Sequence, residues 1–506
     1  MGEIQKDYFF LIEAGSLLLM ALGLVAIVWQ IIVLPQKPIV LPYAYGLQTA
    51  FATISQDASR FLASFFFGSG YGTFLADFTR FRLPAFNLEP NIWNLSFSYS
   101  SSYFLELIAT TGLLGAVAFL SILVVAIKTK VNSPLFFSLF FIFVLAFLLP
   151  FSFTVVALVF IILALYSVSL TVNNDKRVFD ITIVALKLGL NPFETKDKKG
   201  EGNLVLPIIF SVIVALLVVL VGYYTFTFMV SDVKFAQSLK AANANNAQAT
   251  YQLQTQAIQA FPYRSDYHRI FSQINLAIAN SLVSQNQKPN QQMQQNIVSL
   301  LQQAIASAKN AATLSPLTSQ NLQNLSNIYR NLINVGQNAD QFAILTMNQA
   351  IALDPYNPQL YIQLGGIYYQ LNQYDAAQTQ FQTAIKLKGD FANAYYNLGH
   401  TLEAKGNLTD ALSAYQVVRQ LVKDNAENLR KIESEISVLQ SKVGKTETKP
   451  VAQVEQPTKN QPNLDVNTPS VTLPPQKPPI KISPPPGSAS VTPSTAPKPT
   501  VTPATP

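Results

Sequence analysis

Long apolar runs separated by short polar stretches fill the first half of the chain. The runs cover residues 9–34, 104–127, 135–172 and 204–230, and a membrane-spanning helix needs about 20 such residues. The run over 135–172 is too long for one span, so it predicts two helices that turn near Pro150. The pattern predicts a transmembrane domain over residues 1–230 with about five helices, placed at 9–34, 104–127, 135–150, 151–172 and 204–230.

Basic residues gather on both sides of the 135–172 block, and they predict an orientation. Lys128 and Lys130 precede the block, and Lys176 and Arg177 follow it. Because short loops rich in lysine and arginine stay in the cytoplasm, we expect the N-terminus inside the cell. The loop 35–103 and everything after residue 230 are then extracytoplasmic. Apolar positions at helical spacing over 49–67 predict an interfacial amphipathic helix within that loop.

Seven positions near the C-terminus recur at one fixed spacing. Tyr361, Leu364, Gly365, Tyr368, Ala377, Phe381 and Ala384 return 34 residues later as Tyr395, Leu398, Gly399, Leu402, Ala411, Tyr415 and Val418. A 34-residue period with small residues at helix contacts is typical of tetratricopeptide (TPR) repeats, which stack helix pairs into a solenoid. Arrays of this kind usually bind other proteins and rarely catalyse reactions.

The repeat pattern predicts a second domain over residues 231–443. Weaker matches around Ala343, Ala304 and Ala257 indicate four to five units in all, and residues 424–443 predict a capping helix. We expect Gly365 and Gly399 to lie where two helices approach closely. From 444 to 506 the chain is rich in proline, threonine and serine, which predicts a disordered tail.

Composition narrows the possible functions. The chain is 49% hydrophobic and only 12% charged, as expected for a polytopic membrane protein. Its net charge of +7 does not gather into basic patches, so no nucleic-acid partner is predicted. There is no cysteine, and no cofactor or metal site is predicted. The expected fold is all-α: a polytopic helical membrane domain, a TPR α-solenoid and a disordered Pro-rich tail.

Two stretches of the membrane half carry a resemblance to a known family. Residues 67–78 read FGSGYGTFLADF, and residues 100–115 read SSSYFLELIATTGLLG. Together they resemble the O-antigen ligase/polymerase family, whose members move a glycan from a polyprenyl-diphosphate carrier to an acceptor. The resemblance implies that extracytoplasmic arginines hold the diphosphate, which makes Arg80 and Arg82 candidates. Glu106 is a candidate base; alternatively, the arginines anchor the loop at lipid headgroups.

The chain departs from that family in two respects, and the departures decide the prediction. The family has more spans than the five predicted here, and Ser100, Ser101 and Ser102 stand where it places a histidine. Both histidines of the chain, His268 and His400, lie in the repeat region. We therefore predict a multi-pass plasma-membrane protein that acts through its TPR array in cell-envelope glycan or surface assembly.

The predicted partners are the lipid bilayer and a protein or peptide bound in the TPR groove, with a polyprenyl-linked glycan as a further candidate. The candidate groove residues are Tyr361, Tyr368, Tyr395 and His400, although tyrosines at such positions also serve as packing residues. The alternative function is a glycosyltransferase of the O-antigen ligase type.

Overall fold

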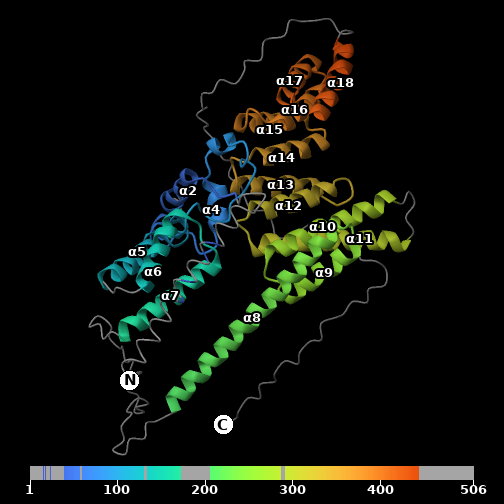
Figure 1. The fold of residues 1–506 in the computed structure, drawn as a ribbon. Coiled ribbons are helices and arrows are strands. Elements are labelled where there is room, and N and C mark those ends of the chain that lie inside the picture. Colours follow the sequence, from blue (N-terminus) through green and yellow to red (C-terminus); the bar gives the residue numbers. More distant parts are fainter. Residues whose placement is uncertain are drawn as a thin grey trace, which may run out of the picture.

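The computed structural model describes residues 39–56, 60–129, 134–172, 205–285 and 291–443, together with single positions between 15 and 25. Within these ranges the chain forms seventeen α-helices and one 3-10 helix, and no strand (Figure 1). The all-helical prediction is confirmed for this part of the chain. Most of the predicted span 9–34 and the whole tail 444–506 lie outside the described residues.

A small helical unit, residues 39–111, precedes the apolar helices; we call it the cap. Its first elements are α2 (Tyr43–Ser55), α3 (Phe61–Phe67), α4 (Phe74–Phe81) and the 3-10 helix η1 (Pro84–Leu88). The rings of Phe78 and Phe86 are buried with their centroids 5.2 Å apart, and Phe97 completes the cluster. The single helix expected over 49–67 is in fact two, because α2 ends at Ser55 and α3 begins at Phe61.

Three apolar helices come next in the chain: α5 (Tyr103–Thr129), which begins inside the cap, α6 (Pro134–Leu148) and α7 (Phe153–Val172). They share a buried cluster that includes Leu139, Phe143 and Tyr166. Helices α6 and α7 occupy the two apolar stretches that the sequence separates near Pro150.

Helix α5 bends sharply at Gly112, where φ is +65°. The ring of Phe119 lies 6.1 Å from the rings of both Tyr103 and Phe104. A straight helix would place residues 104 and 119 about 22 Å apart, so the two arms of α5 fold towards each other. The span expected over 104–127 therefore lies in a helix that bends at Gly112. Leu105 and Ala109 of the first arm join the core of the cap, and the arm after Gly112 packs along α6.

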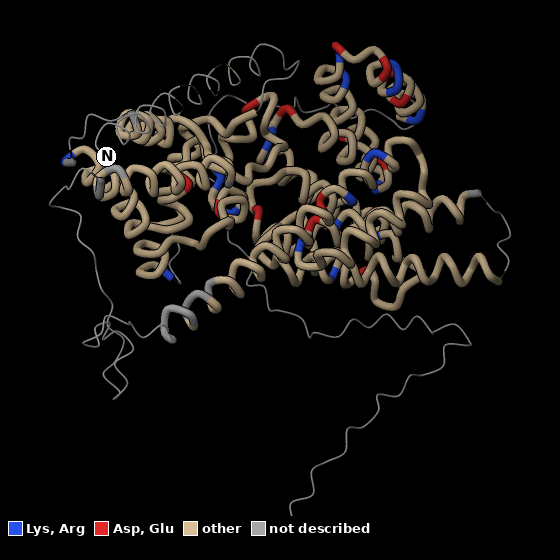
Figure 2. Tube along the Cα trace, turned by 60° about the horizontal axis from the view of Figure 1, so that its bottom comes forward, with Lys and Arg blue, Asp and Glu red and all other residues tan. Residues whose placement is uncertain are grey.

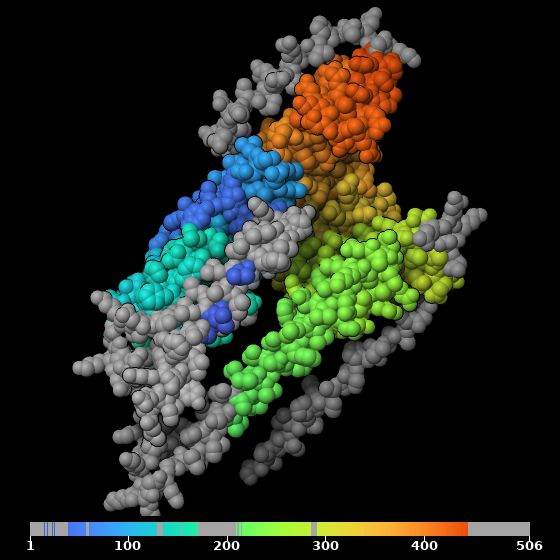
Figure 3. Space-filling model, viewed as in Figure 1, coloured from blue at the N-terminus to red at the C-terminus, as the bar shows by residue number. Residues whose placement is uncertain are grey.

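Helix α8 (Val205–Asn243) joins the apolar half of the chain to the repeats without a break. Its first half is free of charged residues (Figure 2) and projects from the body of the molecule (Figure 3). By length and composition, Ala215–Asn243 and Tyr103–Lys128 are the two stretches of the described chain long and apolar enough to cross a membrane. The boundary expected at residue 230 falls inside a continuous helix.

Ten further helices complete the solenoid. They are α9 (Ala247–Ala260), α10 (Ser265–Gln285), α11 (Gln291–Leu314), α12 (Ser319–Asn331), α13 (Ala339–Leu353), α14 (Pro358–Gln370), α15 (Tyr374–Leu387), α16 (Ala392–Ala404), α17 (Leu408–Leu421) and α18 (Ala426–Val443). Consecutive helices pair as α8–α9, α10–α11, α12–α13, α14–α15 and α16–α17, and α18 covers the end.

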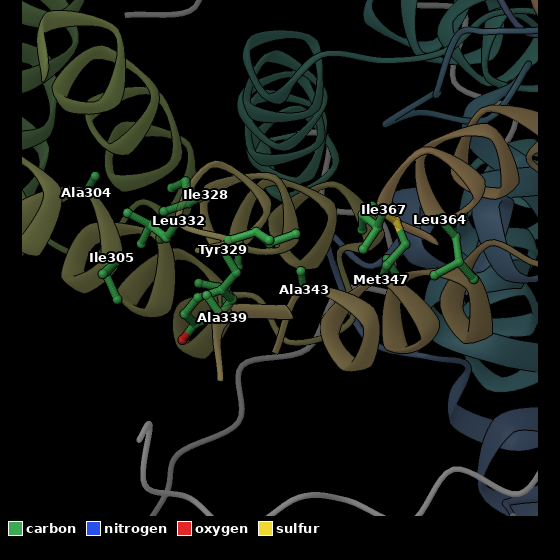
Figure 4. Close-up of a cluster of buried hydrophobic side chains, with 14 of the residues drawn as sticks. Ala304, Ile305, Ile328, Tyr329, Leu332, Ala339, Ala343, Met347, Leu364 and Ile367 are labelled. Atoms are coloured by element: carbon green, nitrogen blue, oxygen red, sulfur yellow. The ribbon is translucent and has the colours of Figure 1, made fainter. Parts of the chain in front are cut away.

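Small and large side chains alternate across the core of the solenoid (Figure 4). Fully buried alanines such as Ala304 and Ala343 lie on second helices, while Ile328, Leu364 and Ile367 come from first helices. Each pair leaves an apolar face that the next pair covers, so the core is continuous from one repeat to the next.

The repeated glycines lie where the sequence predicts a close approach, but the approaching group is a side chain. A Cβ on Gly365 would lie 2.6 Å from Cε1 of Phe381, and a Cβ on Gly399 would lie within 2.3 Å of the Tyr415 ring. Both rings are buried. An aromatic ring of the second helix thus occupies the space that a side chain on the first helix would need.

We expect Gly399→Ala to destabilise the solenoid. Overpacking against Tyr415 costs about 1–3 kcal/mol, which exceeds the gain of about 1 kcal/mol in helix propensity. Gly366→Ala is the matched control, because its Cβ would lie 3.2 Å from the flexible end of Arg330. Thermal unfolding of the purified chain, with hydrogen exchange in α16 and α17, measures the stability of both variants. Equal stability of the two variants would contradict this packing.

Candidate interaction site

The cap contacts the solenoid at two turns between repeats, which follow α13 and α15 (Figure 1). We call this contact the clasp. Its cap residues are Arg82, Asn87 and Trp93, and its solenoid residues are Asp354, Tyr356, Leu387, Lys388 and Phe391. The clasp joins parts of the chain that are 269 residues apart at Asn87 and Tyr356.

A buried ion pair forms one half of the clasp. Nε of Arg82 lies 3.0 Å from Oδ1 of Asp354, and the two side chains are 2% and 3% exposed. Burial raises the pKa of Asp354 to about 6, although the charge of Arg82 opposes this rise. Burial likewise lowers the pKa of Arg82. Each charge is therefore tolerated mainly because the other is present, and removing one would leave the other buried and unpaired.

The local sequence of the turn holds the carboxylate of Asp354 in place. Nδ2 of Asn357 donates a hydrogen bond of 2.8 Å to Oδ2 of Asp354. Oδ1 of Asn357 accepts from the backbone N–H of Gln359, which caps α14, and Pro358 occupies the first helical turn. One asparagine thus begins a helix and leaves the second carboxylate oxygen facing Arg82.

Lys388 forms the other half of the clasp. Its ammonium group donates to the backbone carbonyl of Asn87 at 2.8 Å and pairs with Asp390 at 2.7 Å. It also lies 4.8 Å from the centroid of the Trp93 ring, which packs edge-on against Phe391. The lysine is buried, and its charge is met by a carbonyl, a carboxylate and an aromatic face.

Asn87 links both turns to the cap. Its side-chain Nδ2 donates to the backbone carbonyl of Tyr356 at 2.8 Å and to that of Leu387 at 3.2 Å. These carbonyls belong to the turns that contain Asp354 and Lys388. One fully buried amide therefore bridges two successive repeats.

Asp354 and Lys388 occupy equivalent positions in successive repeats, since 34 residues separate them. Each is the C-cap residue of its helix, and each is buried against the cap, but their charges are opposite. A shift of the cap by one repeat would place Arg82 against Lys388, and two buried like charges repel. The pair therefore specifies which turn the cap contacts.

The structure separates the predicted arginine candidates. Arg80 is exposed near the end of α4, over the ring of Phe81. The backbone becomes extended at Arg82, which turns that side chain towards Asp354. The two guanidinium groups therefore do not form one bidentate clamp for a diphosphate, because Arg82 is buried in the clasp.

Glu106 lies at the start of α5. Oγ of Ser102 accepts a hydrogen bond from the backbone N–H of Leu105, as in a helix N-cap, and the backbone amide of Ser100 faces the Glu106 carboxylate. The Glu106 carboxylate therefore lies inside the cap, next to the start of α5. Its Oε2 is buried and has no hydrogen-bond partner.

The two stretches that carried the family resemblance pack against each other. The backbone N–H groups of Ser69 and Gly70 donate to the carbonyls of Ala109 and Thr110 at 3.0 and 2.9 Å. The contact requires glycine on both sides, since a Cβ on Gly68 or Gly112 would lie 2.6 Å or closer to the opposite backbone. Both glycines also have positive φ. The glycine-rich segment therefore satisfies carbonyls that the bend in α5 leaves free.

The predicted groove tyrosines are mainly packing residues. The hydroxyl of Tyr361 donates to the carbonyl of Pro355 at 2.9 Å, while Tyr368 and Tyr395 pack against the two solenoid cores. His400 lies elsewhere, 4.5 Å from the ring of Tyr396, and its Nε2 is 3.8 Å from Glu435 of α18. The four residues therefore do not converge on one point.

A row formed by His400 and two residues that the sequence did not indicate, Arg330 and Gly366, runs across three first helices. The guanidinium of Arg330 on α12 extends over Gly366 on α14, and its Nε donates to Gln370 at 3.3 Å. His400 on α16 follows Gly366 by one period of 34 residues. The row is open partly because Gly366 lacks a side chain. The 34-residue period relates Gly366 to His400, but it does not place Arg330 beside them.

A cavity of about 370 Å³ opens at the end of this row, between α16, α17 and α18. Tyr396, Lys431, Val418 and Ile432 are among its lining residues. The described residues contain no group of three or more histidine and acidic side chains able to hold a metal ion. The row and the cavity therefore present amides, one guanidinium, aromatic rings and an apolar recess, which are groups suited to polypeptide contacts.

One segment of the solenoid matches a known family. Residues 365–406 match the TPR repeat family, so the chain contains a TPR repeat. No curated protein matches the chain.

Among solved structures, MamA is similar at 18% identity and a TM-score of 0.30, over 39% of this chain and 94% of MamA. TTC0263, a thermophilic TPR protein of Thermus thermophilus, is similar at 15% identity and a TM-score of 0.32, over 42% and 99%. YrrB, described as a TPR protein with an unusual peptide-binding site, is similar at 14% identity and a TM-score of 0.28, over 40% and 90%.

We expect Arg82→Met alone to open the clasp, because the Asp354 carboxylate would remain buried without a counter-charge. Breaking such a pair typically costs about 3–5 kcal/mol. The double variant Arg82→Met with Asp354→Leu should recover most of that loss, because it removes both buried charges. Hydrogen exchange at residues 84–93 and 354–358 reports the opening.

The exposed pair of Arg264 and Asp232 provides the control for the clasp experiment. Its charged atoms are 2.7 Å apart, but the side chains are 39% and 54% exposed. Arg264→Met should therefore change stability by no more than about 1 kcal/mol. If Arg82→Met had an equally small effect, the clasp would not hold the cap and solenoid together.

Proposed function

We propose that the protein is a membrane-anchored scaffold that holds a TPR solenoid at the outer face of the plasma membrane. The observation that carries the proposal is the unbroken helix α8, whose apolar first half continues as the first helix of the solenoid. At 1.5 Å per residue this helix is about 58 Å long, enough to cross a bilayer and still pair with α9. The solenoid then stands directly above the span, with no flexible linker.

The clasp supports a fixed orientation for such a scaffold. With α8 as the first attachment, the pair of Arg82 and Asp354 provides a second one, at the end of the third helix pair of the solenoid. The apolar arm of α5, α6, α7 and the first half of α8 all extend in the same general direction from the cap and solenoid in Figures 1 and 2. This arrangement suits one bilayer on that side.

The proposed partner is a protein or peptide of cell-envelope glycan or surface assembly. It would lie along the row formed by Arg330, Gly366 and His400, where Gly366 leaves room for the guanidinium of Arg330 and that guanidinium can pair with a carboxylate of the partner. Solenoids present extended surfaces of this kind to polypeptides.

An alternative is a glycosyltransferase that uses a polyprenyl-diphosphate carrier. The observation that favours it is the packing of residues 67–78 on residues 100–115, the two stretches with the family resemblance. Arg80 is then the candidate for holding the diphosphate, because Arg82 is buried in the clasp.

Protease protection tests the orientation of the scaffold. With one tag at each terminus of the full chain, protease added to intact cells should remove the C-terminal tag and spare the N-terminal tag. In opened cells both tags should be digested. A C-terminal tag that survives until the cells are opened would overturn the proposal.

Two arginine variants distinguish the scaffold from the enzyme. Arg330→Met should reduce partner crosslinking to the full chain at least about tenfold, the loss expected when a charge-assisted contact worth about 1.5–3 kcal/mol is removed, while Arg80→Ala leaves it unchanged. If the alternative is correct, Arg80→Ala should instead abolish glycan transfer at the cell surface. Unchanged crosslinking in Arg330→Met would exclude this row as the partner site.

A further inference from the structure

Helix α2 has one packed face and one bare apolar face. Gly46 packs on Ser100 and Ser101 at the start of α5, and Ala50 is buried on the same side. Beside this packed side, Tyr43, Leu47 and Phe51 are 49%, 40% and 53% exposed. Because these three residues recur every four positions, they form one stripe along the helix.

Helix α3 extends this apolar surface. Phe61, Leu62, Phe66 and Phe67 are all exposed, and Leu62 and Phe67 are about two-thirds exposed. Ser64 is the buried residue of this helix. A seven-residue helix with so much bare aromatic surface would be unfavourable in water, and a patch of this kind marks a binding surface.

The packing of the glycine-rich segment fixes the position of the exposed face of α3 along the long arm of α5. Gly68, directly after α3, touches Gly112, where the long arm of α5 begins. The next residues of that arm, Leu113, Leu114 and Val117, are exposed as well. The bare surface of α3 is therefore continuous with the outward surface of the predicted span, at its outer end.

Charge is nearly absent from this region. Between residues 39 and 76 the sequence carries two charged side chains, Asp57 and Arg60, and both lie between α2 and α3. Helices that lie in a membrane interface bury an apolar face about 5–10 Å into the boundary between headgroups and acyl chains. Phenylalanine and tyrosine side chains suit that depth.

On the basis of the proposed membrane anchoring, we propose that the bare face of α2 and α3 lies in the outer leaflet, in contact with phospholipid acyl chains. The stripe of Tyr43, Leu47 and Phe51, together with Leu62 and Phe67, forms the contact. The lipid surface then contacts the cap through α2 and α3. The cap lies between the bilayer surface and the solenoid.

Single-cysteine labelling tests this contact directly, because the chain has no cysteine of its own. Leu62→Cys and Phe67→Cys, each carrying an environment-sensitive fluorophore, are measured in proteoliposomes of phosphatidylethanolamine and phosphatidylglycerol that contain the full chain. We expect blue-shifted emission, quenching by lipids with a nitroxide near the headgroup, and loss of quenching by aqueous iodide. Leu88→Cys, an equally exposed position in η1, should show the opposite response.

Val218→Cys on α8 separates failure of this inference from failure of the anchoring. If Val218→Cys is quenched by nitroxide deep in the bilayer while Leu62→Cys and Phe67→Cys respond to iodide, the anchoring stands and the lipid contact is wrong. If neither quencher reaches the two α3 positions, protein covers them and the inference also fails. If iodide quenches Val218→Cys as well, the proposed anchoring itself fails.

Discussion

The buried pair of Arg82 and Asp354 is the interaction on which the arrangement of this molecule depends. Burying two charges is expensive, and a buried ion pair is weak evidence for stability on its own. Its value here lies in specificity, because the equivalent position of the next repeat carries Lys388. A solenoid offers nearly the same turn in every repeat, so a docking unit needs a feature that distinguishes one turn from the next. Opposite charges at equivalent positions provide that feature.

The clasp and helix α8 together fix the orientation of the solenoid. An isolated helix that leaves a bilayer could hold a solenoid at many rotations about its own axis. A second contact through the cap removes that freedom, because Asn87 and Lys388 tie the cap to two successive repeats. The cap is itself held on α5 by the backbone contact of Gly68 with Gly112. The path from apolar helices to solenoid therefore consists of tightly packed, hydrogen-bonded contacts, and rigid elements of this kind transmit position well.

The functional candidates changed once the chain was folded. Arg82 belongs to the clasp and Glu106 lies at a helix start. Tyr368 and Tyr395 pack against the solenoid cores, and Tyr361 is hydrogen-bonded to Pro355. Arg330 was missed because an arginine on an amphipathic helix usually has no role beyond solvation, and nothing in the sequence places it over Gly366. Residues 67–78 and 100–115 meet, and their contact closes the bend in α5, which the sequence did not indicate.

The sequence alone determined the helical class, the apolar runs and the position of the repeats. These follow from local spacing, since a 34-residue period and the distances between small and aromatic residues specify helix pairs whatever surrounds them. The bend at Gly112 and the clasp were decided by tertiary structure. From sequence, a glycine in an apolar run is predicted to be helical. Here the backbone of Ser69 and Gly70 takes the carbonyls of Ala109 and Thr110, and the helix bends at Gly112. An arginine and an aspartate far apart in sequence read as surface charges until folding removes both from water.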